Sequence, residues 1–194
     1  MSHHVHAQQE RPLVRVSLAV SLDGYIADKN GVVDWLNPFF SDETDFAGFM
    51  KGIGAAVMGR KTYDIAVSGV LGPIPPTSYP TYVLTKRPMP NPPARYEAFG
   101  GRPGELVERL CARLAKSGKD IWHMGGGESI EAFRTAGLVD RLELRVIPVL
   151  LGDGVPLFPR HTRGEERWKL TNNRTFKNGV VELWYEHAAT PTSR

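Results

Sequence analysis

Three short segments of the chain combine glycine, hydroxyl and charged side chains at the end of an apolar run. In the first, the strand-like residues 120–124 lead into Gly125-Gly126-Gly127. Consecutive glycines let backbone amides approach an anion closely, and a helix that starts behind them adds partial positive charge. The segment therefore predicts a pyrophosphate site, although a plain strand-to-helix turn also uses glycine.

The second segment follows the apolar residues 55–58 and consists of Gly59, Arg60, Lys61 and Thr62. Glycine permits close approach of a ligand, the two cations can pair with phosphate oxygens, and the threonine hydroxyl can donate a hydrogen bond to one. Each residue taken singly also fits a surface charge or a helix cap. Only the combination favours phosphate binding.

The third segment, Thr85-Lys86-Arg87, places a hydroxyl and two cations after the strand-like run 81–84. Three predicted strands thus end in groups that suit phosphate. Because the carboxyl ends of parallel strands meet at one edge of a sheet, we predict a dinucleotide lying across that edge.

The elements that must position these segments alternate between strands and helices. Strands are predicted at 14–20, 55–58, 81–85, 120–124 and 142–150. Helices are predicted at 61–67, 105–116 and 129–136. A further helix is predicted to begin with Ser41 or Asp42 as its cap, to carry apolar residues at helical spacing up to Ile53, and to end near Gly52 or Gly54. A hairpin, 168–176 with 180–186, closes around Asn178-Gly179. This order predicts an α/β fold with a mainly parallel central sheet, an antiparallel C-terminal edge hairpin and helices on both faces.

Length and composition fit one domain. With 194 residues and 41% hydrophobic content, the chain suits a single domain at residues 13–187, between disordered tails at 1–12 and 188–194. The net charge of +3 is interspersed, which favours neither nucleic acid nor membrane as a partner. The single cysteine, Cys111, excludes an internal disulfide and indicates a cytoplasmic protein, and we expect no metal site.

Four motifs occur together in this chain: Ala19–Ala27, Met58–Tyr63, Met124–Gly127, and Leu138–Leu144 leading into Pro148–Phe158. In this order they resemble the dihydrofolate-reductase-like superfamily, specifically its branch with the riboflavin-biosynthesis reductase (RibD) C-terminal domain. The resemblance covers roughly residues 13–186, and the four motifs together are specific although none is so alone.

The resemblance implies NADPH as the cofactor. Glu128 stands where dihydrofolate reductases often carry an arginine for the adenosine 2′-phosphate, so a strict preference for NADPH over NADH is not implied. The implied cofactor contacts are Ala19, Ile26 and Ala27, the last two at the nicotinamide; Gly59, Arg60, Lys61 and Thr62 at the phosphates; Met124, Gly125, Gly126, Gly127, Glu128 and Ser129 at the pyrophosphate; and Thr85, Lys86 and Arg87 at the 2′-phosphate.

Asp45 and Asp23 are the candidate catalytic residues. Dihydrofolate reductases hold the pterin ring with a carboxylate on the helix after the first loop, and Asp45, with Phe49 one turn later, is the nearest match. Glu43 and Asp34 compete with it. A purely structural interpretation is equally open, because acidic residues in a first helical turn complement the helix dipole.

The resemblance implies a reductase that moves a hydride from NADPH to a C=N or C=O bond of a small heterocyclic or ribosylamino-pyrimidine-like substrate. A 5-amino-6-(5-phosphoribosylamino)uracil reductase is favoured over a dihydrofolate reductase, and a non-catalytic NADPH-binding module is the alternative from another class. We also expect a homodimer, formed through an edge strand Val180–Tyr185 that presents Val181, Leu183 and Tyr185 alternately.

Overall fold

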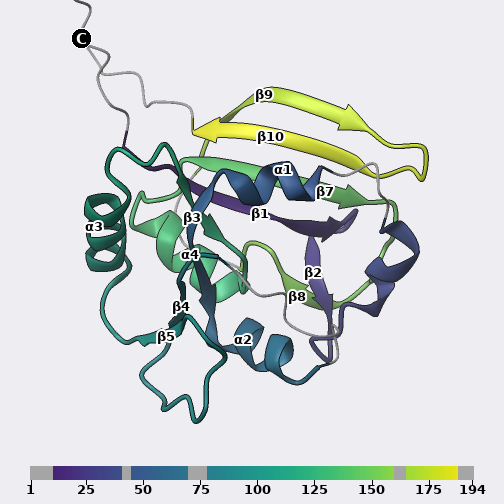
Figure 1. The fold of residues 1–194 in the computed structure, drawn as a ribbon. Coiled ribbons are helices and arrows are strands. Elements are labelled where there is room, and N and C mark those ends of the chain that lie inside the picture. Colours follow the sequence, from purple (N-terminus) through teal and green to yellow (C-terminus); the bar gives the residue numbers. More distant parts are fainter. Residues whose placement is uncertain (1–10, 41–44, 70–77, 160–164, 188–194) are drawn as a thin grey trace, which may run out of the picture.

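A computed structural model describes residues 11–40, 45–69, 78–159 and 165–187 (Figure 1). Residues 1–10 of the predicted tail 1–12, the predicted tail 188–194 and the predicted caps Ser41 and Asp42 lie outside these residues. Arg11 and Pro12, in contrast, belong to the described domain: Pro12 is buried and Arg11 forms an ion pair with Asp140. An eight-stranded sheet forms the centre, in the order β5-β4-β3-β6-β1-β7-β10-β9. Its strands are β1 (Val14–Ser21), β3 (Ile53–Gly59), β4 (Thr81–Leu84), β5 (Tyr96–Phe99), β6 (Asp120–His123), β7 (Arg141–Ile147), β9 (Trp168–Thr175) and β10 (Val181–His187).

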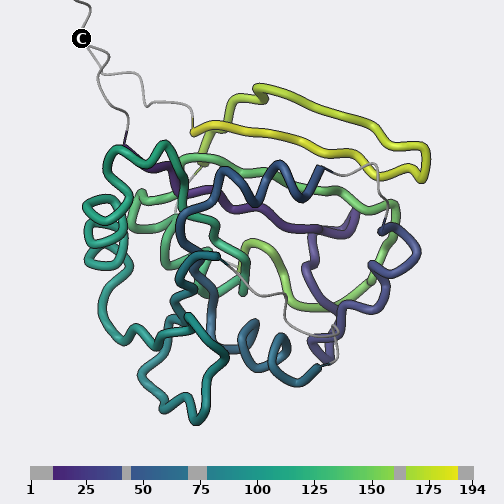
Figure 2. The backbone as a smooth tube through the Cα atoms, viewed as in Figure 1, coloured from purple at the N-terminus to yellow at the C-terminus, as the bar shows by residue number. Residues whose placement is uncertain are grey.

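The predicted mixture of parallel and antiparallel pairing is confirmed. The six strands from β5 to β7 in this order run parallel to one another. The hairpin β9–β10 adds to β7 through antiparallel pairing and forms one margin of the molecule, as the chain path in Figure 2 shows. All parallel strands therefore end at the same edge of the sheet.

Alternation along β1 explains how the sheet acquires two different faces. Val14, Val16 and Val20 point into the main apolar core, where they pack with Leu106 and Phe133 from helices α3 (Pro103–Leu114) and α4 (Gly127–Thr135). Arg15, Ser17 and Ala19 face the opposite side, because successive side chains of a strand alternate. That side is covered by α1 (Phe46–Lys51), α2 (Arg60–Val67) and the 3-10 helix η1 (Asp34–Phe39).

Several element predictions need correction. Ile53 begins β3 and does not continue the preceding helix, because Gly52 ends α1 one residue earlier. Strands β2 (Tyr25–Asp28), β5 and β8 (Gly154–Pro156) and helix η1 were not predicted. Two of those strands form a separate small sheet, and runs of three or four residues carry too few alternating positions to be distinguished from loops.

The predicted edge strand is also wrong. Val181–His187 pairs with β7 on one side and β9 on the other, so it is an interior strand. The outermost strand is β9, and every residue of it after Trp168 is exposed.

Two further features are absent from the described residues. No helix among them is long and apolar enough to cross a membrane. Likewise, no group of three or more histidine, cysteine, aspartate or glutamate side chains within the described ranges could hold a metal ion.

We propose that dimerisation occurs through β9, because an exposed edge strand offers unpaired backbone groups to a second copy. Light scattering at micromolar protein should give twice the monomer mass of 21.5 kDa. Leu170→Lys should shift the mass toward the monomer, since Leu170 is an exposed apolar residue of β9. Val67→Lys, at an exposed apolar residue on α2, is the matched control and should leave the dimer intact. A monomeric wild-type protein would contradict the proposal.

Candidate functional site

The three predicted phosphate segments lie side by side. Strands β4, β3 and β6 are neighbours in the sheet and run parallel, so their carboxyl ends meet. The Gly59 amide at the end of β3 donates a hydrogen bond of 3.0 Å to the Gly125 carbonyl just beyond β6. The second and first segments are thus in direct backbone contact, at the kind of sheet edge where dinucleotides bind.

Two helix N-termini converge at this contact. Helix α2 begins after Gly59 and α4 begins after Gly126, and neither N-cap residue makes a side-chain hydrogen bond. A Cβ added to Gly126 would lie 3.1 Å from the Thr62 hydroxyl, so the first turns of the two helices face each other closely. The first amides of a helix have no acceptor within it, and they favour an anion. Two such ends together suit a pyrophosphate.

Two different local constraints favour glycine in the run Gly125–Gly127. Gly125 and Gly126 adopt φ angles of 126° and 81°, which side-chain-bearing residues rarely adopt. A Cβ on Gly127 would overlap the Pro156 carbonyl oxygen at the end of β8. A Cβ on Gly125, in contrast, would meet no atom within 4 Å, so space remains beside the loop. Gly125 and Gly127 are buried and Gly126 is partly exposed, so the loop is tightly built and offers a ligand access mainly at Gly126.

Ser129 shapes the glycine loop. Its hydroxyl donates to the carbonyl oxygens of Gly125 and Gly126, at 2.9 Å in each case, and the residue is buried. These hydrogen bonds fix the conformation of the glycine loop. Ser129 therefore shapes the loop through these carbonyl oxygens, and its predicted cofactor contact stays a prediction.

Arg60 connects the second segment to the third. Its guanidinium pairs with Asp64 at 2.7 Å and donates to the Pro88 carbonyl at 3.0 Å, and only 19% of the side chain is exposed. Arg87 reaches the same Asp64 at 3.5 Å, and its amide donates to the Thr85 hydroxyl. Arg60 therefore holds the 85–88 loop against α2, which brings Lys86 and Arg87, both exposed, to the candidate site.

Lys61 in the first turn of α2 and Glu128 in the first turn of α4 form an ion pair of 3.1 Å. Their side chains are 78% and 82% exposed, so the pair is held weakly. Lys61, a predicted phosphate contact, is thus paired with Glu128, the residue that stands where dihydrofolate reductases often carry an arginine.

The predicted nicotinamide residues approach this site through the small sheet. Ile26 and Ala27 belong to β2, which pairs with β8, and β8 ends against Gly127 at the start of α4. Ala19 lies on β1 with its side chain in a cluster that includes Ile147 and Trp35. The side chain of Ala27 is buried, so a contact with a ligand would come from its backbone.

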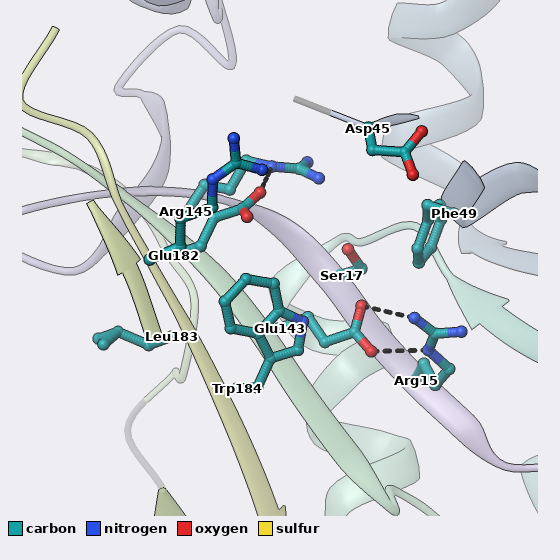
Figure 3. Close-up of a pocket in the computed structure, with 10 residues that line it drawn as sticks. Arg15, Ser17, Asp45, Phe49, Glu143, Arg145, Glu182, Leu183 and Trp184 are labelled. Carbon is teal, nitrogen blue, oxygen red and sulfur yellow. Dashed lines mark hydrogen bonds and ion pairs between the residues drawn. The ribbon is translucent and has the colours of Figure 1, made fainter. Parts of the chain in front are cut away.

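A pocket of about 220 Å³ lies on the sheet face covered by α1 (Figure 3). In this view Ser17 and Glu143 lie between Phe49 of α1 on one side and Trp184 of β10 on the other. Phe49 of the pocket and Met124, which precedes the glycine loop, pack against the same apolar cluster. The lining residues are Arg15, Ser17, Asp45, Phe49, Glu143, Arg145, Arg174, Glu182, Leu183 and Trp184.

With this geometry established, the chain can be compared with known proteins. The family model of the RibD C-terminal domain matches residues 12–182. The chain belongs to the RibD C-terminal domain family. It is 32% identical over 181 residues to the uncharacterized protein YyaP of Bacillus subtilis (strain 168), which covers 88% of this chain and 92% of that protein.

Solved structures agree with this RibD_C fold. A protein assigned to riboflavin biosynthesis in Shewanella sp. PV-4 has a TM-score of 0.77 and 27% identity, with 92% of this chain and 99% of that one covered. A diaminohydroxyphosphoribosylaminopyrimidine deaminase/5-amino-6-(5-phosphoribosylamino)uracil reductase of Thermotoga maritima has a TM-score of 0.63 and 18% identity, over 92% of this chain and 57% of that one. The predicted fold class is confirmed.

Within this RibD_C domain, Asp45 serves two purposes. Its carboxylate accepts the Gly48 amide at 2.8 Å and caps α1, and it also lines the pocket. The structural and functional interpretations of this residue are thus compatible. The described part of η1 places Asp34 away from the lining residues, and Glu43 lies outside the described residues.

Asp23 lies away from the pocket lining. Its carboxylate accepts the Ser21 hydroxyl at 2.6 Å and the Gly152 amide at 2.7 Å, and so ties the β1–β2 turn to the loop after β7. These bonds, that from Ser21 most strongly, lower the pKa of Asp23. A carboxylate held in its ionised form is a poor proton donor, so the geometry favours a structural role.

Sequence reasoning missed most of the pocket. Arg15, Glu143 and Glu182 were not singled out, although each has apolar neighbours on both sides in its strand. The clearest available signal was the period-two alternation of charged and apolar residues at Arg141, Glu143 and Arg145 of β7. It indicates a polar sheet face, but only the strand order brings the three strands together.

His123 is completely buried directly before the glycine loop. Its Nδ1 accepts the Gly125 amide at 3.3 Å, and its ring lies 4.8 Å from that of Phe133 in an edge-on contact. Its Nε2 has no partner among the described residues. Burial lowers the pKa of His123 from 6.5 to about 4, so the imidazole is neutral and can accept from the loop.

We predict that the free energy of unfolding decreases in acid because of His123. The unfolded chain takes up this proton near pH 6.5, whereas the folded chain resists it until about pH 4. The contribution is therefore complete above pH 6.5 and is lost as the pH falls toward 4, by roughly 3 kcal/mol. Denaturant titrations should show a flatter pH dependence in His123→Asn, whose amide oxygen replaces Nδ1. The surface variant His187→Asn should keep the wild-type slope; equal slopes in all three proteins would refute this assignment.

Proposed function

We propose that this protein is an NADPH-dependent reductase that transfers a hydride to a small heterocyclic or ribosylamino-pyrimidine-like substrate. The single observation that supports it most is the convergence of two helix N-termini without side-chain caps at the glycine loop. Family membership supports a reductase of riboflavin biosynthesis at the level of the family. The solitary Cys111 agrees with a reducing, cytoplasmic setting, and a small molecule is the only partner proposed besides a second copy.

The chain's own groups would bind the cofactor in three places. The amides at the starts of α2 and α4, with the Thr62 hydroxyl, would hold the pyrophosphate. Lys86 and Arg87 would face the adenosine 2′-phosphate, with Arg60 and Asp64 keeping their loop in place. Bound NADPH supplies the hydride from its nicotinamide ring, and the protein aligns that ring with the acceptor.

The pocket beside α1 would hold the substrate. Phe49 and Trp184 offer aromatic surface for a planar ring, and the Asp45 carboxylate can accept hydrogen bonds from its amino groups. The same two features, a carboxylate and an aromatic residue one turn apart on a helix, keep dihydrofolate reductase activity as a second candidate. Oxidation of NADPH followed at 340 nm, a property of the cofactor, with each candidate substrate distinguishes the two. Binding of NADPH without turnover on either would favour a non-catalytic module.

A pair of variants tests the glycine loop as the cofactor site. Gly126→Asp should weaken NADPH binding at least tenfold, because it adds a carboxylate between the two helix ends. Glu128→Gln should strengthen NADPH binding by up to about tenfold, since it removes a negative charge and releases Lys61 from its ion pair. Fluorescence titration with NADPH and NADH measures both effects. Unchanged affinity in both variants would place the cofactor elsewhere, and far-ultraviolet circular dichroism controls for folding.

Asp45 is tested by a variant that separates its two roles. Asn is as good an N-cap as Asp, so Asp45→Asn should leave the melting temperature unchanged while it removes the charge from the pocket. Turnover should fall by at least about tenfold. Asp45→Ala should lose turnover and also destabilise α1. Full activity of Asp45→Asn would assign this carboxylate to capping alone.

A further inference from the structure

Charges in the pocket are balanced. Its ionisable lining consists of three arginines, Arg15, Arg145 and Arg174, and three carboxylates, Asp45, Glu143 and Glu182. A pocket built for a phosphate dianion needs an excess of positive charge, usually from arginines that are free to form two hydrogen bonds. The lining as a whole offers no such excess.

The two inner arginines are already committed. Arg15 binds both oxygens of Glu143, at 2.6 and 3.0 Å, and reaches Asp120 at 3.3 Å; the Arg15 and Glu143 side chains are only 16% and 7% exposed. Arg145 binds Glu182 at 2.5 Å, with side chains 26% and 10% exposed. To contact a phosphate through both sides of its guanidinium, Arg15 would leave the largely buried Glu143 carboxylate without its partner, which is strongly unfavourable. Arg145 is bonded to Glu182 through Nε alone, and that carboxylate offsets its charge.

The outer arginine does not change this balance. Arg174 lies over the Phe176 ring, with its guanidinium carbon 4.6 Å from the ring centre. In the strand register it stands directly opposite Glu182. A phosphate placed on Arg174 would therefore also lie near the Glu182 carboxylate, and like charges repel in a partly buried setting.

We propose that the pocket selects an uncharged, phosphate-free heterocycle whose N–H groups donate to its carboxylates, and discriminates against the phosphorylated form of the same molecule. This inference rests on the proposed function, because it names the substrate class of that reductase. Carboxylate oxygens accept such N–H groups, and Phe49 and Trp184 offer ring surfaces to a planar molecule. The name of the Thermotoga maritima protein, in contrast, includes a phosphoribosylamino compound.

A matched ligand pair tests the proposal in the full chain. The probes are 5-amino-6-(ribitylamino)uracil and its 5′-phosphate, which differ only in the phosphate and are already reduced, so neither is turned over. Binding is followed by quenching of the Trp184 fluorescence, and Trp184→Phe identifies the signal that comes from the pocket. The phosphate-free probe should bind at least about tenfold more tightly than its phosphate.

A charge variant with a matched control completes the test. Glu182→Gln releases Arg145 and should shift the affinity ratio about tenfold toward the phosphorylated probe. Glu186→Gln makes the same change on the same strand, in an ion pair with Arg141 outside the pocket, and should leave the ratio unaltered. Tighter binding of the phosphate by the wild type, equal shifts in the two variants, or no quenching by either probe would overturn the inference.

NADPH binding in the same samples separates this inference from the proposed function. If NADPH binds and is oxidised with a phosphorylated substrate that the wild type prefers, the reductase stands and the charge-balance inference fails. If the phosphate-free probe is preferred but NADPH does not bind, the pocket inference stands and the cofactor proposal fails.

Discussion

Contact between Gly59 at the end of β3 and Gly125 beyond β6 is the constraint on which the candidate site depends. The amide-to-carbonyl bond of 3.0 Å draws two strand ends together so closely that a Cβ on Gly59 would lie 3.0 Å from the Ser129 hydroxyl. The helices that follow these glycines therefore start side by side. Neither can carry a side-chain cap at that point, so their free amides face the same space.

The surroundings of this contact support it from three sides. Arg60 holds the 85–88 loop against α2, and the end of β8 packs on Gly127. The buried His123 accepts a hydrogen bond from the Gly125 amide. The Arg60 guanidinium and the Ser129 hydroxyl are likewise occupied by hydrogen bonds within the protein. Arg60 and Ser129, which look like direct phosphate contacts from their types, are thus largely used to build the loop.

The two regions of the site differ in electrostatic character. The glycine loop presents helix ends and exposed cations, which suit the negative charge of a dinucleotide. The pocket beside α1 instead pairs its inner arginines with carboxylates that are nearly buried. Under the proposed function, a charged cofactor and an uncharged substrate would not compete for the same cations.

Local sequence determined the carboxyl ends of β3, β4 and β6, the glycine loop and the C-terminal hairpin, because glycine runs, β-branched runs and an Asn-Gly turn act over a few residues. The strand predicted at 142–150, in contrast, ends at Ile147. It did not determine which strand is outermost: Val181–His187 has the alternation of an edge strand, yet β9 covers it. Nor did it show that Arg15, Glu143 and Glu182 line one pocket, because they lie on three strands far apart in the chain and meet only through the order β1-β7-β10. Asp45 illustrates the boundary between the two. Its capping of α1 is a local interaction, although the sequence pattern predicted Ser41 or Asp42 as the cap and Asp45 in the first turn. Its place in the pocket depends on where α1 packs on the sheet.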